Sequence, residues 1–449
     1  MVMALKKFVC MSIGLLLLLG VFAACTFEAS SNSGISDLDS ANEKKQWTFL
    51  VYMAADNNLE NAAIEDFNEM EASDFNSDEI NIIVLFDRNN YKDCNDSDEW
   101  KGTRLYEILK DENGMNNAIR SKRISCKALG ISTRNDVSLD MGSPKTLEEF
   151  LKSTVDFYPA QHYGLFVWGH GTGYRSSCAG IKKNRAVALD DSANSFMENC
   201  AVASAVKNGM NGKKLDFIAY DTCFGSELEV VYEFPEAAEY FIGTQNVQVE
   251  SGLNYQKIFE YGIEKSETGL SAGEFILGRL SDDMKNDFSV INLSESENVF
   301  SSFEKFALHA ASFILTKSDG KNIRDEILAK GDCFRSFESV NNPVYVNVMS
   351  LVDLLSTKYA GLDAYKNQLH ESLKKMIACY QGKKENLPLG IYFCSVDNAN
   401  DLIMNFSPYY LNGSNLEKQC SFVKKSKGYV LTVKKSGSLL DKLFENYNF

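Results

Sequence analysis

Hydrophobic and polar positions follow two alternating patterns along most of the chain. From Gln46 onward, short apolar runs of strand length alternate with segments that carry apolar residues at helical spacing. The expected strands are 47–55, 80–87, 103–109, 163–169, 215–221 and 239–245. The expected helices are 57–71, 143–158, 191–209 and 226–234. Ser143 is the candidate N-cap of the second helix, and Pro144 takes its first position.

Strongly apolar strands separated by helices predict an α/β fold. Such strands are typical of a mostly parallel sheet with helices on both faces, in which ligands bind beyond the C-terminal ends of the strands. The alternation is clearest over residues 47–265, which we expect to form the main domain. Residues 266–449 are expected to form a C-terminal α/β region, with helices at 301–315 and 346–362 and strands at 388–395 and 428–433.

The first residues do not read as part of the fold. Residues 1–24 hold two lysines, an apolar core and small residues before Cys25, which is typical of a secretory signal peptide. The ending VFAAC resembles a bacterial lipoprotein processing site, so Cys25 is the candidate lipidated residue. The polar stretch 25–46 suits a flexible tether. We therefore expect an exported protein held by its lipid in the bacterial cell envelope, at the outer membrane or the cell surface. A plain signal peptide is the alternative.

Charge and cysteine content narrow the class of function. The chain has 61 acidic and 46 basic side chains, a net charge of -15 and no long basic run. Nucleic acid is therefore not expected as a partner. Of the 11 cysteines, nine remain once the signal peptide and the lipidated residue are set aside, and no CxxC pair occurs. An odd number leaves at least one thiol unpaired.

Among the four histidines, His170 has the most informative surroundings. His309 falls within an amphipathic helix, His370 has no motif around it, and His162 precedes a strand. His170 instead follows the strand 163–169 directly, in the glycine-rich segment WGHGTGY. Glycines there permit positive φ and let the backbone approach a substrate closely.

Cys223 stands in an equivalent place, directly after the strand 215–221 and before an expected helix. If the two strands are neighbours, Cys223 and His170 emerge at the same edge of the sheet. This arrangement suits a Cys/His dyad, in which an imidazole and a helix N-terminus make the thiol more acidic. The backbone N–H groups of Gly171 and Cys223 are then candidates for an oxyanion hole. The alternative is a small apolar cysteine buried at a strand end.

The segments WGHGTGY and DFIAYDTCFGSELE together resemble the clostripain family of cysteine peptidases, relatives of caspases, gingipains and legumains. The segments WTFLVYMAADNNLE and PLGIYF resemble other parts of that family, and the likeness is strongest over 47–255. His170 precedes Cys223 by 53 residues, near the offset of about 50 residues in caspases. The resemblance implies a caspase-like fold, His170 as catalytic histidine, Cys223 as nucleophile, and cleavage after arginine or lysine.

The resemblance also places Asp221 in the pocket for the substrate's P1 side chain. A carboxylate there selects guanidinium or ammonium groups by charge-assisted hydrogen bonds, although Asp221 can equally cap the turn after its strand. The sequence departs from the family downstream, where Ser251 replaces a second acid, with Glu250 beside it, and Leu253 replaces a tryptophan. These departures put the preference at P1 in doubt and leave the catalytic pair untouched.

Two further expectations come from the family. Its members are often activated by self-cleavage between histidine and cysteine, and here Lys182, Lys183 and Arg185 are the candidate sites. A solvated basic loop is the alternative. The chemistry requires no cofactor. Calcium is suggested by the family alone, because Asp190 and Asp191 are too few to predict a metal site.

The sequence therefore predicts an exported, lipid-anchored cysteine endopeptidase acting on proteins or peptides with basic residues. The first alternative is a non-catalytic surface lipoprotein that uses the same fold as a binding module. The second is a transpeptidase or amidase that uses the same dyad with a different acceptor.

Overall fold

The structure is a computed structural model of the chain. It describes residues 43–89, 100–173, 187–249, 251–334, 345–381 and 387–393, together with residues 421, 439 and 443. All of these residues belong to one compact unit.

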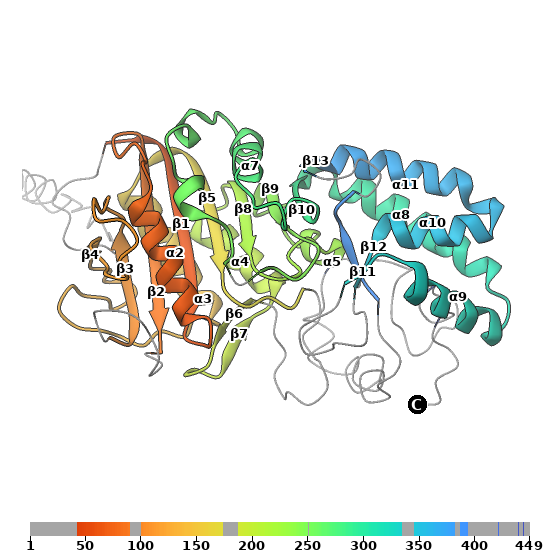
Figure 1. The fold of residues 1–449 in the computed structure, drawn as a ribbon, viewed down its shortest axis with the longest axis horizontal. Helices are drawn as coiled ribbons and strands as arrows, with labels where there is room; N and C mark the ends of the chain where they lie inside the picture. Colours follow the sequence, from red (N-terminus) through yellow and green to blue (C-terminus); the bar gives the residue numbers. More distant parts are fainter. Residues whose placement is uncertain are drawn as a thin grey trace, which may run out of the picture. The chain divides into compact units, whose positions relative to one another are not determined.

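A nine-stranded sheet organises the described residues (Figure 1). Its order is β13-β10-β9-β8-β5-β1-β2-β3-β4. The five central strands are parallel: β9 (Ala238–Thr244), β8 (Leu215–Asp221), β5 (Ala160–Trp168), β1 (Lys45–Ala55) and β2 (Ile80–Arg88). The outer strands are antiparallel: β13 (Ile377–Tyr380), β10 (Phe288–Asn292), β3 (Gly102–Glu107) and β4 (Lys122–Ile124). The predicted α/β fold with a mostly parallel sheet is confirmed.

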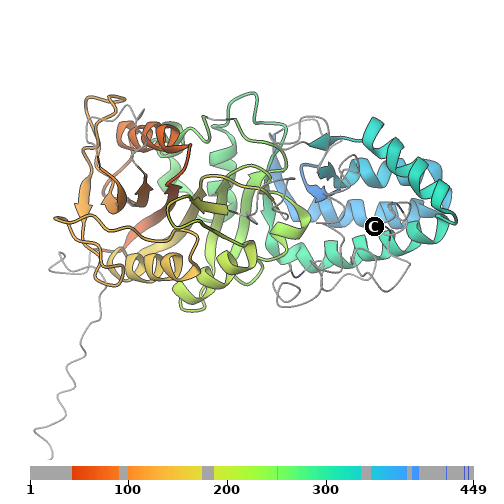
Figure 2. The ribbon, with the colours of Figure 1, turned by 90° about the horizontal axis from the view of Figure 1, so that it is seen from below.

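Helices cover both faces of this sheet because its central strands are apolar on both sides. Along β1, Trp47 and Val51 belong to one hydrophobic core, and Leu50 and Tyr52 to the other. The first core includes residues of α2 (Glu60–Ala72), α6 (Tyr255–Ile258) and α7 (Gly269–Leu277). The second includes residues of α3 (Pro144–Phe157) and α4 (Asn199–Gly209). Figure 2 shows α2 on one side of the strands and α3 on the other.

The six predicted strands and the helices α2 and α3 are confirmed. Ser143 is the N-cap of α3 by position, although its side chain makes no capping hydrogen bond. The helix predicted over 191–209 is wrong in its first half. That stretch turns sharply, because Asp190 Oδ1 accepts the N–H of Ala193. The hairpin consists of β6 (Val187–Asp190) and β7 (Ser195–Met197).

The helix predicted over 226–234 is also shorter than expected. Only α5 (Leu228–Val231) is helical. Glu227 has an extended backbone and forms a β-bridge with Gly390, so the helix cannot begin earlier. An extended residue held by another segment thus overrides the local helical pattern.

The C-terminal part continues the same architecture. Its helices are α8 (Ser296–Phe313), α9 (Lys317–Lys330), α10 (Val348–Lys358) and α11 (Asp363–Met376), with short 3₁₀ turns at Ile263–Lys265, Leu293–Glu295 and Ala360–Leu362. A small sheet joins β11 (Cys333–Phe334), β12 (Tyr345–Asn347) and β14 (Gly390–Tyr392). Both the main sheet and the second core extend past residue 265. The domain boundary placed there stays a prediction, and the strand expected at 428–433 lies outside the described residues.

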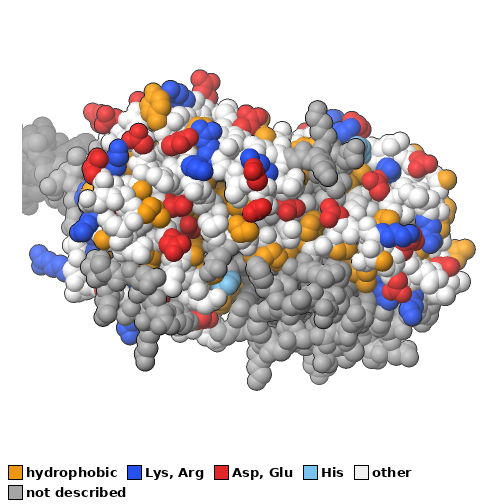
Figure 3. Space-filling view, viewed as in Figure 1, with side chains coloured by type: hydrophobic (Ala, Val, Ile, Leu, Met, Phe, Trp, Pro, Cys, Tyr) orange, Lys and Arg blue, Asp and Glu red, His pale blue; other side chains and the backbone are white. Residues whose placement is uncertain are grey.

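Two features of the described residues concern membrane-spanning helices and surface charge. None of its helices is long and apolar enough to cross a membrane. On the face drawn in Figure 3, acidic and basic side chains are interspersed.

Candidate active site

The pairing of β5 with β8 places His170 and Cys223 at one edge of the sheet. In this parallel pair Trp168 is opposite Asp221, the last residue of each strand, and His170 and Cys223 lie two residues beyond these strand ends. The two segments beyond the strand ends stay together, because Gly169 N donates to Asp221 O at 3.3 Å. The expectation that both residues emerge side by side at the C-terminal edge is therefore met. Their catalytic roles stay predictions.

Glycines around His170 make this close approach possible. Gly169 and Gly173 have φ values of 136° and 66°, a region that favours glycine. A Cβ atom added at Gly171 would lie 2.5 Å from the carbonyl oxygen of Cys223. A larger residue at this position would push the histidine and cysteine segments apart.

His170 is held by Asn58, three residues beyond the end of β1. The ring Nε2 of His170 lies 2.7 Å from Oδ1 of Asn58. An amide oxygen only accepts hydrogen bonds, so Nε2 carries a proton and Nδ1 is the basic nitrogen of the neutral ring. Sequence reasoning missed Asn58. The available signal was the polar run 56–58 directly after a predicted strand, which ends at the same edge as His170.

We expect Asn58→Ala to lower kcat about fivefold, the effect of losing one hydrogen bond of about 1 kcal/mol. Asn58→Asp should retain most of the activity and move the limb of the pH-rate profile predicted for His170 to higher pH, because a carboxylate raises the pKa of a neighbouring imidazole. Steady-state kinetics across pH would measure both. Unchanged kcat and pH profiles in both variants would show that Asn58 does not position His170.

Cys223 is a free thiol packed against the second core. Its Sγ accepts the backbone N–H of Gln248 at 3.3 Å. Burial raises the pKa of this thiol, the Gln248 hydrogen bond opposes that rise, and the charge of Asp221 adds to it. The helix N-terminus expected next to Cys223 is absent, since α5 begins only at Leu228. The expectation of a thiol acidified by a helix end is therefore wrong for this form of the protein.

Asp221 is buried, and its carboxylate accepts hydrogen bonds from Gln248, Leu253 and Tyr255. Its Oδ1 accepts from the side-chain amide of Gln248 and, at 3.2 Å, from the backbone N–H of Leu253. Its Oδ2 accepts from the hydroxyl of Tyr255 at 2.8 Å. Burial raises the pKa of the Asp221 carboxyl to about 6, against the lowering effect of these hydrogen bonds. The residue predicted to recognise the P1 side chain therefore already has hydrogen-bond partners within the protein.

A second buried carboxylate, Asp66 of α2, lies close to Asp221. A Cβ atom added at Gly252 would lie 3.3 Å from both carboxylate oxygens of Asp221 and from Oδ2 of Asp66. Asp66 Oδ2 also accepts from Trp168 Nε1 at 2.6 Å. Burial, together with the charge of Asp221, raises the pKa of Asp66 well above its usual value. Nothing in the local sequence of α2 distinguishes Asp66 from a surface acid, and sequence reasoning missed it.

The other predicted site residues are placed as follows. Ser251 is exposed on the segment that covers Asp221. Glu250, the candidate cleavage sites Lys182, Lys183 and Arg185, and the candidate lipidated Cys25 lie outside the described residues.

The remaining histidines lie elsewhere in the fold. His162 Nδ1 lies 2.7 Å from Asp216 Oδ1, and its ring stacks on Trp47 near the start of β1. His309 of α8 contacts the hydroxyl of Tyr365. His370 lies in α11, where burial lowers its pKa.

The fold and this edge define a class of protein: an α/β fold in which a cysteine and a histidine emerge from adjacent parallel strand ends, as cysteine peptidases require. Residues 51–419 match the model of the Clostripain family, Peptidase_C11. This protein therefore belongs to the clostripain family of cysteine peptidases.

Individual relatives agree with this assignment. Clostripain from Hathewaya histolytica is 27% identical over 237 residues, which are 50% of this chain and 44% of that protein. The chain thus matches less than half the length of this relative.

Two solved structures support the fold. An inactive zymogen C11 protease from Parabacteroides distasonis matches with a TM-score of 0.58 and 18% identity, over 85% of this chain and 100% of that one. A secreted C11 cysteine protease from Bacteroides thetaiotaomicron, in complex with an irreversible peptide inhibitor, matches with a TM-score of 0.54 and 17% identity, over 81% and 98%. At these identities the likeness establishes the caspase-like fold.

Proposed function

We propose that this protein is a cysteine endopeptidase that cleaves proteins or peptides after arginine or lysine. The observation that carries the proposal is the strand register. The pair Trp168 and Asp221 sets His170 and Cys223 at matching positions beyond adjacent parallel strands. Membership of the clostripain family supports the same chemistry.

The proposed reaction follows from these two side chains. Cys223 transfers its proton to His170, and Sγ attacks the substrate carbonyl carbon to form a C–S bond. The oxyanion is stabilised by the backbone N–H groups of Gly171 and Cys223. Collapse breaks the C–N bond, and His170 protonates the leaving amine. A water activated by His170 then hydrolyses the thioester and restores the thiol.

Asp221 and Asp66 are proposed as the acids that select a basic P1 side chain. The two carboxylates flank the backbone at Gly252, next to the position where the family carries a second acid and this chain has Ser251. Asp66 can therefore supply the second acid of the pocket, because a bound guanidinium would favour its ionised form. The side-chain amide of Gln248 donates to the Asp221 carboxylate, so a P1 guanidinium has to displace that amide to bind. Guanidinium forms stronger, charge-assisted hydrogen bonds than a neutral amide does.

Peptides that differ only at P1 test the proposal. A soluble version from residue 26 onward, without the signal peptide and the candidate lipidated cysteine, should hydrolyse arginine and lysine substrates under reducing conditions and leave alanine and aspartate substrates intact. Equal turnover of alanine peptides would contradict the acid pocket. Transfer to an added amine in preference to water would indicate a transpeptidase. If none of the four peptides is hydrolysed and the intact mass of the protein does not change, a binding module would be favoured.

Self-cleavage after Lys182, Lys183 or Arg185 is proposed as the activating step. One structural relative is described as an inactive zymogen. The raised thiol pKa and the covered Asp221 are properties expected of a resting form. Intact mass spectrometry after incubation should show two fragments, and the triple substitution of these residues by alanine should prevent their formation. Full activity of an uncut chain would refute the activating role.

The signal 1–24 and Cys25 support export and lipid anchoring in the bacterial cell envelope. One structural relative is described as secreted. We expect the expressed protein to partition into detergent, and Cys25→Ser to move it to the aqueous phase. An unlipidated wild-type protein would instead support the plain signal peptide.

A further inference from the structure

A tyrosine from the C-terminal part of the fold contacts both segments of the candidate active site. The hydroxyl of Tyr345, in β12, donates at 2.6 Å to the carbonyl oxygen of Thr172, two residues beyond His170. The ring of Tyr345 lies against the ring of Phe224, the residue after Cys223, with 4.8 Å between the ring centroids. One buried side chain therefore joins the histidine segment to the cysteine segment.

These segments are packed too closely for a larger residue at Gly173. A Cβ atom added there would lie 2.6 Å from the hydroxyl oxygen of Tyr345 and 3.0 Å from Cβ of Phe224. The backbone of Phe224 has a φ of 54°, in the left-handed region that an aromatic residue rarely adopts. Its N–H donates to the carbonyl oxygen of Asn246 at 3.0 Å, and its ring packs on Tyr345. Both contacts hold the residue after the thiol in this conformation.

The small C-terminal sheet fixes Tyr345 in turn. β12 pairs with β14, and the ring of Tyr392 stands edge-on to Tyr345 with 5.8 Å between the ring centroids. The same sheet is bonded to the chain beyond Cys223, since the N–H of Gly390 donates to the carbonyl oxygen of Ser226 at 2.9 Å. The Tyr345 hydroxyl is thus presented to the histidine segment by elements other than β5, the strand from which that segment emerges.

A second buried side chain holds the next carbonyl of the histidine segment. Nδ2 of Asn199, the first residue of α4, donates to the carbonyl oxygen of Gly173 at 3.2 Å. Oδ1 of Asn199 accepts from the hydroxyl of Tyr220 at 3.1 Å, which fixes the orientation of the amide. Two consecutive carbonyl oxygens beyond His170, those of Thr172 and Gly173, are therefore anchored.

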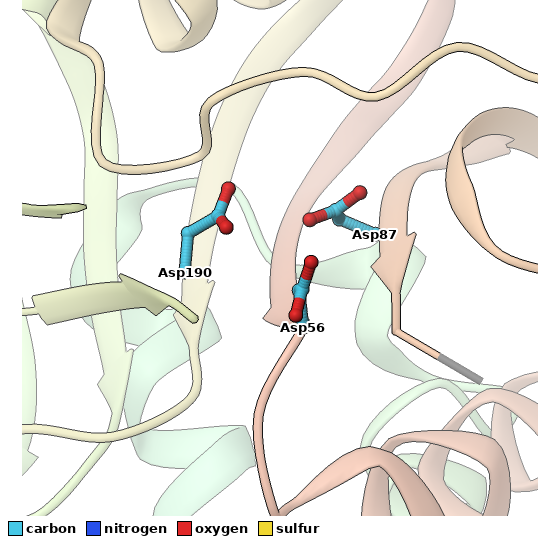
Figure 4. Close-up of side chains that lie close together, drawn as sticks. All are labelled: Asp56, Asp87 and Asp190. Atoms are coloured by element: carbon cyan, nitrogen blue, oxygen red, sulfur yellow. The ribbon is translucent and has the colours of Figure 1, made fainter. Parts of the chain in front are cut away.

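The support on the β1 side of His170 is of another kind. Asn58 contacts the imidazole itself and lies two residues beyond Asp56. Three buried carboxylates converge there, within 4.8 Å of one another (Figure 4), those of Asp56, Asp87 and Asp190. These donors fit the calcium ion that the family resemblance suggests. Asn58 thus contacts the ring of the histidine, whereas Tyr345 contacts the backbone that follows it.

We propose that Tyr345 is a positioning residue, which holds the histidine segment at the distance from Cys223 that proton transfer requires. This role rests on the proposed function, because positioning matters only where the two side chains react. A general base acts within hydrogen-bond reach of its proton, and a small displacement lowers the rate steeply. Because the anchored carbonyls precede the candidate cleavage sites, the same contacts hold His170 in a cut chain.

Tyr345→Phe tests the hydroxyl, because the ring can stay against Phe224. In the full chain, kcat for arginine peptides should fall about fivefold or more with KM unchanged, as expected on losing one hydrogen bond that orients the reacting groups. Tyr52→Phe is the matched control, since Tyr52 is buried and its hydroxyl donates to the carbonyl oxygen of Met141 at 2.8 Å. It removes the same kind of bond, so it should lower the Tm similarly and leave kcat unchanged.

Alkylation of Cys223 by iodoacetamide gives a readout that does not depend on peptide hydrolysis. The reaction is followed between about pH 6 and pH 9 in the tryptic peptide 215–257, in which Cys223 is the only cysteine. His170→Ala should slow alkylation below the thiol pKa, because no imidazole then assists loss of the proton. Tyr345→Phe should slow it in the same pH range and should add nothing in the His170→Ala background, because it acts through His170.

Three results would overturn the positioning role, and they differ in what else they exclude. If His170→Ala leaves the alkylation of Cys223 unchanged, the dyad is absent, and the proposed function fails as well. If His170→Ala slows alkylation while Tyr345→Phe matches Tyr52→Phe in kcat and in alkylation, only the positioning role fails. A loss in Tyr345→Phe that is confined to KM would assign Tyr345 to substrate binding instead.

Discussion

Replacing Cys223 by alanine is expected to lower hydrolysis of a peptide with arginine at P1 by at least about 10³-fold. The substitution removes the sulfur atom that we propose as the nucleophile, and losses of this kind range from about 10³ to 10⁶ in kcat. The fold should be unaffected, because Cys223 contributes one hydrogen bond and a partly buried side chain. Initial rates and a thermal melt of the same preparation would measure both effects.

Two comparisons make this result specific. Cys379→Ala, at another free and partly buried thiol, should keep full activity. Combining Cys223→Ala with His170→Ala should cost no more than Cys223→Ala alone, because residues that act as a unit are not additive. Wild-type rates in Cys223→Ala would exclude the nucleophile assignment. Additive losses in the double variant would mean that His170 acts independently of the thiol.

Substituting Asp221 by asparagine is expected to lower kcat/KM for arginine peptides about 10²–10³-fold, while alanine peptides change little. The variant removes one charge of a buried, hydrogen-bonded ion pair with the substrate, a loss of about 3–4 kcal/mol. Asp66→Asn should shift the ratio of arginine to alanine turnover in the same direction. Asp216→Asn, at the opposite end of β8, is the matched control. An unchanged ratio in Asp221→Asn would remove Asp221 from the pocket.

The raised pKa of Asp221 predicts a pH dependence of specificity. Because burial raises its pKa to about 6, the Asp221 carboxyl becomes protonated as the pH falls below 6 and loses its attraction for a guanidinium. The ratio of kcat/KM for arginine to that for alanine should therefore fall between pH 7 and pH 5. The ionisation of the Cys223 thiol and the His170 imidazole affects both substrates equally, so it does not change this ratio. A flat ratio would show that Asp221 stays ionised throughout.

Much of the fold could be predicted because its signals are local. The apolar runs that became β1, β5 and β8 carry enough β-branched and aromatic residues to be recognised in isolation. The β6–β7 hairpin could not be recognised in the same way. It depends on a turn bonded to the Asp190 side chain and on contacts with distant segments. The truncation of α5 likewise depends on a bridge to Gly390, far along the chain.

In the candidate site, too, some residues have local sequence signals and others depend on tertiary contacts. His170 and Cys223 follow apolar strands directly, so their common edge could be inferred once the strands were assumed to be neighbours. Asn58 follows a predicted strand that ends at the same edge as His170, but the sequence does not show which residue it contacts, and the segment around Asp66 gives no sign of a target at all. Their roles depend on tertiary proximity alone, to His170 in one case and to Asp221 in the other. Burial is equally invisible in the sequence, and it raises the pKa values of both Asp221 and Cys223.

The pairing of β5 with β8 has a consequence for a protein whose backbone has been cut between these two strands. These strands hold each other through backbone hydrogen bonds and a shared core, and the proposed cuts fall between them in sequence. Breaking the backbone after residue 182, 183 or 185 therefore leaves both halves of the active site joined. The cut protein should migrate as one particle under native conditions and separate only in denaturant. Residues 26–182 and 183–449, produced as separate polypeptides, should then reconstitute activity when they are refolded together.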